Sequence, residues 1–285
     1  MSSKIPYLNE VWNPITGCSG KGCATKETCW AREMVNRFPA IHGVQLGIGG
    51  SWAKGDLQPE RIPFSIPVFH PDRLDQPLHW KKPRRVGVCF MGDLFDEGVR
   101  FDYIDRIFQT MLVASKFHIF FLLTKQPQQA LKFFQWETQE TGEGCSLADN
   151  IWLGVSCCTQ ADVDCMVPDL LRVPGKKWIS LEPCMESIKL IIEEPDPKKP
   201  CLNCGQKGCD ICGNVGYLFN GLDWVVIGCH SNPRRYPCKI EWVESVVEQC
   251  KDSGVPVYVK QIEINGKCVR DIERFPKHLQ VREMP

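Results

Sequence analysis

The chain has 285 residues, 43% of them hydrophobic, and its 34 basic side chains balance 34 acidic ones, so the formal net charge is zero. This is the composition of a globular protein, and it excludes a disordered chain and a coiled coil. The absence of net charge also argues against a protein that coats nucleic acid or anionic membrane through long-range attraction, although a local basic patch could still guide a substrate.

Cysteine is the unusual residue, with 17 in the chain. No positively charged leader precedes an apolar core at the N-terminus, and no segment approaches the roughly 18 uninterrupted apolar residues of a membrane span. We therefore expect a cytoplasmic protein, not associated with membranes, in which the thiols are reduced and some of them bind metal.

Strand and helix signals alternate along the chain. A first strand is predicted in Glu10–Gly17, and nearly continuous apolar runs, typical of strands covered on both faces, follow at Val86–Phe90, His118–Thr124, Ile151–Ser156, Trp178–Leu181, Trp224–Gly228 and Val257–Lys260. Segments with helical periodicity lie between them, at Phe101–Ala114, Pro127–Trp136, Gln160–Leu171 and Glu241–Asp252. The pattern predicts βαβ units in one α/β domain over residues 1–285, with a parallel sheet that is open or curled into a full or partial barrel.

Two segments interrupt this alternation. Residues 38–83 are rich in Gly and Pro, and they predict a long, mostly irregular insertion that acts as a lid or a substrate-facing loop. Residues 193–221 open with a linker-like composition and then place four cysteines within twelve residues. We expect this second segment to be a small metal-binding excursion from the main fold, not an independent domain.

The first cysteine group follows the first predicted strand. Cys18, Cys23 and Cys29 lie in one short glycine-rich loop that leads into a helix. Three thiolates leave one metal position open, which suits a catalytic zinc or a [4Fe–4S] cluster whose fourth iron binds a small molecule. The spacing does not choose between zinc and iron, and three unpaired loop cysteines are the simpler alternative.

The second cysteine group consists of two Cys-x-x-Cys-Gly turns in a nearly duplicated unit. Its four ligands would be Cys201, Cys204, Cys209 and Cys212. Two such turns form a closed four-thiolate site, which predicts structural zinc, with a second iron–sulfur cluster as the alternative.

Polar residues follow the predicted strands, whose carboxyl ends meet at one edge of a parallel sheet. They are Met91-Gly92-Asp93, Thr124-Lys125, Ser156, Glu182 and Gly228-Cys229-His230. Together they offer the carboxylate, cation and hydroxyl groups that a polar cofactor needs. Each of them alone is also explained as a helix cap, a local hydrogen bond or a surface charge.

Six sequence blocks in one order carry a resemblance to a known family. They are WNPITGC with the two cysteines that follow it, LHWKKPRRVGVCFMGDLF, FFLLTKQP, IWLGVS, SLEP and LDWVVIG. In these blocks the chain resembles the phage Gp37/Gp68 family (DUF5131), a branch similar to the radical S-adenosylmethionine (radical SAM) enzymes. The cysteine spacing C-x4-C-x5-C departs from the C-x3-C-x2-C that is most familiar in that superfamily.

The resemblance implies a partial (β/α)6 TIM-like barrel of the radical SAM type. A [4Fe–4S] cluster would bind to the first cysteine group, and S-adenosylmethionine would bind to its open iron. Gly92 and Asp93 would meet the methionyl ammonium, and Lys125 or Ser156 would meet the carboxylate or the ribose. Trp30 would help to wall the cofactor pocket, and Glu182 belongs to the same cofactor-binding set.

The sixth strand end differs from the relatives, which favour Gly-Gly-Glu-Ser-Gly where this chain has Gly-Cys-His-Ser-Asn. Cys229 is therefore a candidate hydrogen-atom donor, and His230 is a candidate acid or base. Cys157, Cys158 and Cys184 lie near the same predicted mouth. The alternative is that such cysteines are small buried hydrophobic residues.

The first functional hypothesis is an enzyme that cleaves S-adenosylmethionine reductively and uses the resulting 5′-deoxyadenosyl radical to abstract hydrogen from a substrate. The electron would come from a flavodoxin- or ferredoxin-type protein. Because the family is associated with phage genomes and some superfamily members act on thymine in DNA, a nucleobase or nucleotide is the leading substrate. Such a ring would suit a pocket near Trp52, Trp80 and Phe95.

Two alternatives stay open. One is a non-enzymatic zinc module that binds nucleic acid or protein, for example through the basic run Lys81–Arg85, although such a run is more often a solvated approach to a strand. The other is a barrel that has lost its chemistry and serves as a scaffold. Bound iron and sulfide would favour the enzyme, and zinc alone would favour the module.

Overall fold

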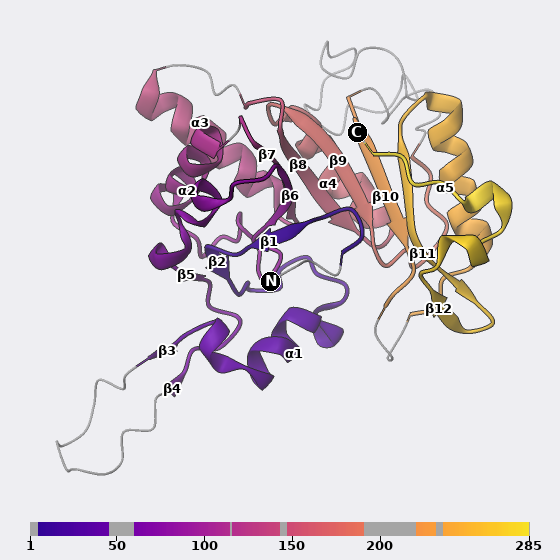
Figure 1. The fold of residues 1–285 in the computed structure, drawn as a ribbon, viewed down its shortest axis with the longest axis horizontal. Helices are drawn as coiled ribbons and strands as arrows, with labels where there is room; N and C mark the ends of the chain where they lie inside the picture. The colour runs from indigo at the N-terminus through magenta and orange to yellow at the C-terminus, as the bar shows by residue number, and fades with distance from the viewer. Residues whose placement is uncertain are drawn as a thin grey trace, which may run out of the picture.

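The structure, a computed structural model, describes residues 5–45, 60–114, 116–142, 147–190, 221–231 and 236–284. Within these ranges the main sheet is a curled half-barrel of eight strands that follow one another in chain order (Figure 1). The strands are β1 (Glu10–Trp12), β6 (Arg84–Val88), β7 (His118–Thr124), β8 (Ile151–Cys157), β9 (Lys176–Leu181), β10 (Trp224–Gly228), β11 (Val257–Ile264) and β12 (Lys267–Val269).

Strand direction confirms the predicted α/β class with a mostly parallel sheet. Every neighbouring pair from β1 to β11 is parallel, and only β12 runs antiparallel to β11. The described sheet has eight strands, whereas the resemblance implies six and the strand signals themselves predict seven; the unpredicted strand is β12, which is added by a hairpin. Asn265 and Gly266 form this turn with positive φ angles of 50° and 69°, the conformation that Asn-Gly favours in a two-residue hairpin.

Of the five α-helices in the described residues, four cover the outer face of the sheet, and one lies apart from them below it (Figure 1). The outer helices are α2 (Phe101–Ala114), α3 (Pro127–Thr141), α4 (Gln160–Arg172) and α5 (Ile240–Ser253), and the helix below is α1 (Trp30–Arg37). Thr159 begins α4 with a reciprocal capping box to Asp162. Gly142 and Gly254, both left-handed, end α3 and α5.

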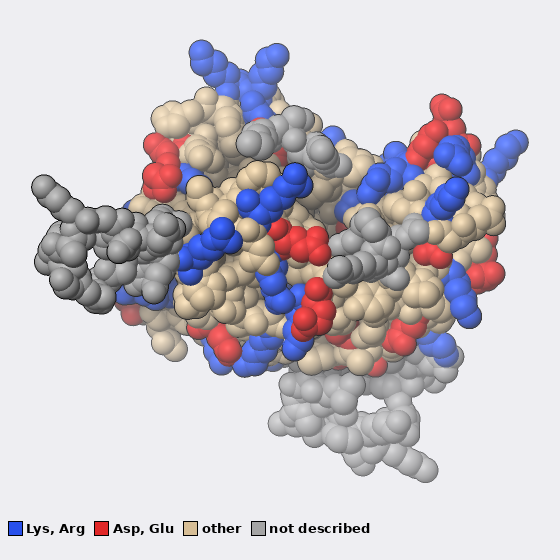
Figure 2. All heavy atoms as spheres, turned by 90° about the horizontal axis from the view of Figure 1, so that it is seen from below, with Lys and Arg blue, Asp and Glu red and all other residues tan. Residues whose placement is uncertain are grey.

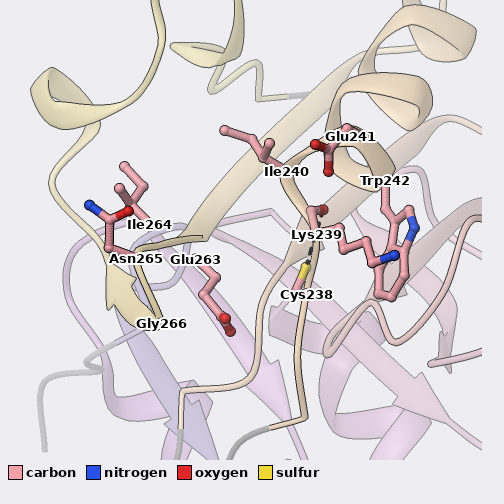
Figure 3. Close-up of a pocket in the computed structure, with 9 residues that line it drawn as sticks. All are labelled: Cys238, Lys239, Ile240, Glu241, Trp242, Glu263, Ile264, Asn265 and Gly266. Carbon is pink, nitrogen blue, oxygen red and sulfur yellow. Dashed lines mark hydrogen bonds between the residues drawn. The ribbon is translucent and has the colours of Figure 1, made fainter.

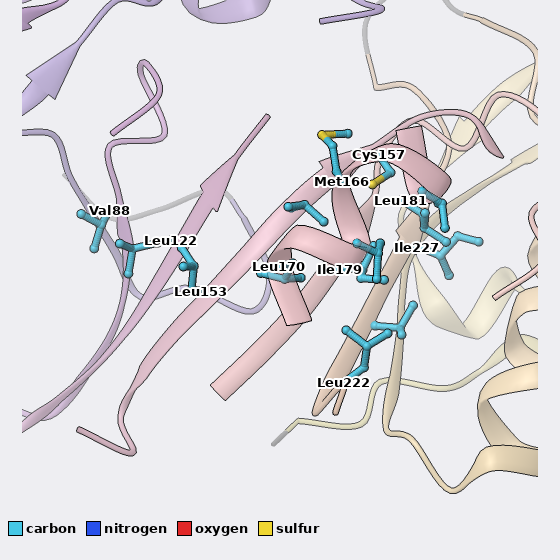
Figure 4. Close-up of a cluster of buried hydrophobic side chains, with 14 of the residues drawn as sticks. Val88, Leu122, Leu153, Cys157, Met166, Leu170, Ile179, Leu181, Leu222 and Ile227 are labelled. Carbon is cyan, nitrogen blue, oxygen red and sulfur yellow. The ribbon is translucent and has the colours of Figure 1, made fainter. Parts of the chain in front are cut away.

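The main core lies between the sheet and these outer helices. Figure 4 shows one part of it, where Met166 and Leu170 of α4 pack over Leu153, Ile179 and other strand residues. The side chains that alternate with them point to the inner, concave face. Because both faces are covered, the strands are apolar almost throughout, as the sequence indicates.

The concave face carries a second, mainly aromatic cluster, which we call the aromatic floor. Its members are Tyr7, Leu8, Phe121, Trp152, Trp178, Trp224, Val226 and Tyr258. The rings of Trp178 and Trp224 lie 5.3 Å apart, and Tyr7 meets the Trp224 ring edge-on at 5.3 Å. Gly154 makes room for this packing, because a Cβ atom there would lie 2.6 Å from Trp178 Nε1. The floor therefore covers the concave face mainly along the first halves of β8 to β11.

The described part of the 38–83 insertion contains short elements. It includes β3 (Val44–Gln45), β4 (Glu60–Arg61), β5 (Val68–Phe69), and short 3₁₀ turns; β3 pairs with β4, and β5 pairs with β2 (Ile15–Thr16). A lid role for this segment stays a prediction. The 193–221 segment lies outside the described residues apart from Gly221, and Trp52 lies outside them as well.

Among the described helices, none combines the length and the apolar character that crossing a bilayer requires.

Candidate functional site

The loop that carries Cys18, Cys23 and Cys29 is attached to the carboxyl edge of the main sheet. Gly17 forms a parallel bridge with Gly92, and its N–H donates to the carbonyl of Met91 at 2.9 Å. A side chain at Gly92 would collide with the Gly17 carbonyl oxygen, so glycine is required for this close approach. The cysteine loop therefore starts directly beside the end of β6.

Asp96 ties the next part of the loop to the same edge. One of its carboxylate oxygens accepts hydrogen bonds from the Ser19 N–H at 2.8 Å, the Ser19 hydroxyl at 2.6 Å and the Gln126 amide at 3.0 Å. Its other oxygen accepts from the Gly98 N–H at 2.9 Å. Since Asp96 is only 2% exposed, these contacts are protected from water, and they join the cysteine loop to the segments after β6 and β7.

A buried Thr-His-His network holds the base of the loop. The Thr16 hydroxyl lies 2.8 Å from His42 Nδ1 and 2.8 Å from His70 Nε2, and His42 Nε2 lies 3.1 Å from the Pro63 carbonyl. Burial lowers the pKa of His42, and it lowers the pKa of His70 to about 4 with help from the nearby Arg73. Both rings are therefore neutral at pH 7, and the network positions Thr16 immediately before the loop.

The three thiols differ in their surroundings. Cys18 and Cys29 pack against the small apolar cluster of Ala31, Val35, Phe64 and Met91, whereas the Cys23 sulfur lies 3.6 Å from the Thr25 hydroxyl. Burial raises the pKa of Cys18 to about 12, and the nearby Asp93 carboxylate adds to this shift.

The donor set fits an iron–sulfur cluster chemically, because three partly exposed thiols share one loop. The geometry is not preassembled: in the described ranges no three His, Cys, Asp or Glu side chains are grouped closely enough to hold a metal ion. Binding of a cluster would therefore require the loop to bring its sulfurs together.

Lys125, which follows β7, lies beside this loop. Its ammonium donates to the Ser156 hydroxyl at 2.7 Å, and the Lys125 carbonyl lies beside Gly22 of the loop. Burial alone would lower the pKa of Lys125, but Cys158, Cys23 and Asp93 outweigh it, and the pKa is raised. Lys125 is therefore a half-buried positive charge between the strand ends and the cysteine loop.

Asp93 positions this lysine. Its carboxylate accepts hydrogen bonds from the Thr124 hydroxyl at 2.8 Å, the Lys125 N–H at 2.8 Å and the Phe95 N–H at 3.0 Å. Burial raises the pKa of Asp93, and these three donors counteract part of that shift. A carboxylate has about four acceptor positions, and these three bonds use three of them.

A second polar group lies above the aromatic floor. Glu182 accepts hydrogen bonds from Lys260 at 3.0 Å and from Ser180 at 3.2 Å through the same oxygen. The Lys260 ammonium lies 5.7 Å from the centre of the Tyr7 ring. Ser180 is the register partner of Ser156 on the next strand, which connects this group to Lys125. The predicted strand-end residues Lys125, Ser156 and Glu182 therefore form one continuous polar layer.

Comparison with known protein families covers both the cysteine loop and the strand ends. The chain matches the family described as "Protein of unknown function (DUF5131)" over residues 2–283. It belongs to the DUF5131 family. No curated protein and no solved structure matches the chain. In this DUF5131 protein the match covers the cysteine loop and all the strand ends.

Three other predicted site residues of the DUF5131 protein lie at the rim or behind the sheet. Trp30 is the first residue of α1 and is 52% exposed. Cys229 is 1% exposed and belongs to the core between the sheet and the outer helices. His230 is 9% exposed, and its ring stands edge-on to Tyr236 at 5.6 Å. The predicted four-thiolate site of Cys201, Cys204, Cys209 and Cys212 lies outside the described residues.

The expected aromatic substrate pocket does not form from Trp80 and Phe95. Phe95 is fully buried among Phe108, Phe133 and Phe134 of α2 and α3, so it is a core residue. Trp80 precedes β6 and packs against His118, the first residue of β7, which places it at the amino edge. Trp80 therefore lies away from the cysteine loop, and the Phe95 side chain points into the core.

The basic run Lys81–Arg85 also lies at the amino edge of the sheet. Arg84 forms an ion pair with Glu10 at 2.8 Å and lies over the Trp80 ring. Figure 2 shows the face on which α1 and β12 lie, and there Lys, Arg, Asp and Glu side chains are interspersed with uncharged surface. Neither observation indicates a surface of one charge sign for nucleic acid.

Several residues that build the site have no clear signal in the sequence. Thr16, His42, His70, Asp96 and Lys260 act through contacts with segments far away along the chain. Among them, only Lys260, the last residue of a predicted strand, and Asp96, a few residues after another, hold positions that could indicate a role.

Proposed function

We propose that this chain is a radical SAM enzyme in which Cys18, Cys23 and Cys29 bind a [4Fe–4S] cluster. The observation that carries the proposal is the Gly17–Gly92 bridge, which attaches a three-cysteine loop to the carboxyl edge of a parallel half-barrel. In barrels of parallel strands this edge is where chemistry takes place. The resemblance to the radical SAM enzymes supplies the identity of the cluster and of S-adenosylmethionine.

The bound cluster would supply the electron that cleaves S-adenosylmethionine to a 5′-deoxyadenosyl radical. The residues of this chain would bind and orient that cofactor. Lys125, held by Ser156, offers a half-buried ammonium to the methionyl carboxylate. Asp93 keeps one acceptor position for the methionyl ammonium, and Trp30 would cover the outer side of the pocket.

On the substrate side, the layer of Ser180, Glu182 and Lys260 combines donors and acceptors of the kind that the edges of a nucleobase need. We propose a nucleobase or nucleotide as the substrate, with His230 as an acid or base; Cys229 lies in the core behind the sheet, so the predicted hydrogen-atom donor is not part of this proposal. A flavodoxin- or ferredoxin-type protein would be the reductant, and the four downstream cysteines would hold structural zinc.

Metal and cofactor analysis tests the proposal. Anaerobically purified protein should contain about four irons per chain at its loop site, and replacement of Cys18, Cys23 and Cys29 together by Ala should remove them. Replacement of the exposed Cys165 by Ala, the matched control, should change nothing.

The cofactor site has its own variant. Lys125→Met should keep the iron and weaken S-adenosylmethionine binding by about tenfold or more, because one buried charge-assisted contact is lost. If the triple variant keeps its iron, the loop is not the cluster site and the iron belongs to the four downstream cysteines. If the wild-type protein holds zinc alone, the proposal fails and the non-enzymatic zinc module replaces it.

A further inference from the structure

Helix α1 carries an apolar stripe on its exposed side. Trp30, Met34 and Phe38, the last of them the C-cap, follow one another at intervals of four residues, so they lie on the same side of the helix on successive turns. Met34 is 40% exposed and Phe38 is 47% exposed. The helix packs through a different side, which carries Ala31 and Val35. The three exposed residues, which we call the α1 stripe, are therefore not needed to hold α1 in place.

The α1 stripe lies next to the cysteine loop. Helix α1 begins at the residue after Cys29, and its buried side belongs to the small apolar cluster against which Cys18 and Cys29 pack. Figure 1 shows α1 below the sheet, apart from the four outer helices. A protein bound to the stripe would therefore lie beside the loop and beside the cluster that we propose to bind there.

Basic side chains surround the α1 stripe. The segment from residue 26 to residue 38 contains three basic residues, Lys26, Arg32 and Arg37, against two acidic ones. Arg61 adds a fourth cation, because it donates to the Asn36 carbonyl at 3.4 Å. Within the described ranges, none of these four cations forms an ion pair. The surface therefore favours a partner with acidic side chains.

Two of these cations border the cysteine loop itself. A Cβ atom at Gly20 would lie 3.7 Å from Lys26 Cβ and 3.8 Å from Arg32 Nη2. At the other end of the stripe, the Arg37 guanidinium lies over the Phe38 ring, 5.3 Å from its centre. Positive charge is therefore placed at both ends of the apolar stripe, beside the loop and beside the last turn of the helix.

A groove at the other end of the sheet has the opposite charge balance. It lies between the start of α5 and the β11–β12 hairpin and has a volume of about 730 Å³ (Figure 3). Glu241 and Glu263 line it together with one cation, Lys239, which lies over the Trp242 ring. An acidic partner would be repelled there. Because β11 and β1 lie near opposite ends of the strand order, the groove is also remote from the cysteine loop.

We propose that the α1 stripe is the docking surface of an acidic one-electron carrier protein. The inference rests on the proposed function, because it supposes a cluster in the cysteine loop that needs an electron. One electron leaves the reduced cofactor of the carrier and enters the cluster, and no bond is formed or broken. Electron-transfer encounters bury less than about 1,200 Å² in total, so three apolar side chains with a charged surround suffice. A second copy of this chain fits the surface less well, because the same cations would face one another across a twofold axis.

Binding of flavodoxin, the probe for such a carrier, tests the inference on the full-length protein. Oxidised flavodoxin is titrated into the wild-type protein by isothermal titration calorimetry at low and at high ionic strength. We expect binding that weakens as salt is added, because salt screens the attraction between basic and acidic surfaces. Met34→Glu and Phe38→Glu together should weaken the affinity by about tenfold or more. Trp30 is left unchanged, because it is proposed to wall the cofactor pocket.

The matched control uses two exposed apolar residues at the amino edge of the sheet. Val113 and Phe117 are also four residues apart, are 69% and 63% exposed, and lie near the end of α2 and directly before β7. Val113→Glu and Phe117→Glu together should leave flavodoxin binding unchanged. Hydrogen–deuterium exchange of the wild-type protein gives a second readout, since bound flavodoxin should slow exchange in residues 30–38.

Several results would overturn the inference. They are absence of flavodoxin binding to the wild-type protein, equal weakening by the two double variants, and slower exchange only outside α1. A wild-type dimer that the Met34→Glu and Phe38→Glu variant converts to a monomer would assign the stripe to a second copy of the chain. The exchange measurement needs no variant, so a poorly folding one cannot obscure the answer.

Reduction by dithionite separates this inference from the proposed function. If the wild-type protein forms no 5′-deoxyadenosine with dithionite, the proposed function fails, whatever flavodoxin does. If the Met34→Glu and Phe38→Glu variant forms it normally with dithionite and has lost flavodoxin binding, the docking surface is supported. If that variant keeps full flavodoxin affinity, the docking surface alone is wrong.

Discussion

Replacement of Thr16 by Val would test whether the buried Thr-His-His network holds the base of the cysteine loop. The Pro63 carbonyl can only accept, so His42 Nε2 carries the proton and His42 Nδ1 is a bare acceptor. The Thr16 hydroxyl must then donate to His42, and it accepts the proton of His70 Nε2. Valine preserves the shape of threonine and removes the one atom that both rings share.

The expected loss of stability follows from this geometry. Thr16, His42 and His70 are 0%, 0% and 8% exposed, so water does not replace the missing hydroxyl without rearrangement. A buried polar group that loses its partner costs about 1–3 kcal/mol, and two ring nitrogens lose theirs. We expect the free energy of unfolding, measured by urea denaturation at pH 7.5, to fall by about 3 kcal/mol. Alkylation of Cys18, two residues further along, should become faster.

The matched control is Thr110→Val in α2. Thr110 is 9% exposed, and its hydroxyl donates to the Arg106 carbonyl at 3.0 Å, a bond whose loss leaves no side chain unpaired. Its cost should stay below about 1 kcal/mol. Equal losses for the two variants, or a loss below about 1 kcal/mol for Thr16→Val, would refute the assignment of the network.

Four further predictions concern the same framework. The pKa of His70 is lowered by burial from 6.5 to about 4, so below pH 6.5 the unfolded chain binds a proton that the folded chain does not. The free energy of unfolding should decrease as the pH falls from 6.5 towards 4, by at most about 3 kcal/mol from this group, and His70→Asn should remove that share in pH-dependent denaturation. Asp96→Ala should destabilise the protein by about 2 kcal/mol and expose the loop cysteines to faster alkylation, because Ser19 loses its acceptor; unchanged alkylation rates would contradict this. Gly154→Ala should cost about 1–3 kcal/mol in thermal or urea unfolding, since the added methyl collides with Trp178, and a neutral effect would show that the aromatic floor is loosely packed. Replacement of the four downstream cysteines by Ser should remove zinc and lower the melting temperature without loss of iron. These residues are Cys201, Cys204, Cys209 and Cys212. Elemental analysis that finds iron in place of zinc at this site would refute the structural zinc assignment.

Most of the main fold could be predicted from the sequence, because its signals are local. The strand His118–Thr124 and the helix Phe101–Ala114 have the predicted bounds, since apolar runs and helical periodicity define them along the chain. The hairpin of β12 was missed, although Asn265-Gly266 is a strong local signal for such a turn. The segment after this turn, Lys267–Val269, is only three residues long, so it shows no apolar run that would identify it as a strand.

The candidate site was only partly predictable. The carboxyl ends of parallel strands must meet, so Lys125, Ser156 and Glu182 could be grouped from their positions alone. The contact of Thr16 with His70 joins residues far apart in the chain, and no periodicity reports it. Phe95 follows a strand as the polar residues do, and only its packing against α2 and α3 identifies it as core. The direction of the side chain distinguishes a site residue from a core residue at a strand end, and the position in the sequence does not give that direction.

Formation of 5′-deoxyadenosine is the measurement that tests the proposed function most directly. Cluster-loaded protein, reduced with dithionite and supplied with S-adenosylmethionine under anaerobic conditions, is quenched and analysed by liquid chromatography and mass spectrometry. The wild-type protein and the Cys165→Ala control should release 5′-deoxyadenosine and methionine, slowly even without substrate. The triple variant of Cys18, Cys23 and Cys29 should release neither. A fully loaded, reduced protein that binds S-adenosylmethionine but never yields 5′-deoxyadenosine, even when cell extracts are offered as a source of substrate, would contradict the proposal and favour a scaffold without this chemistry.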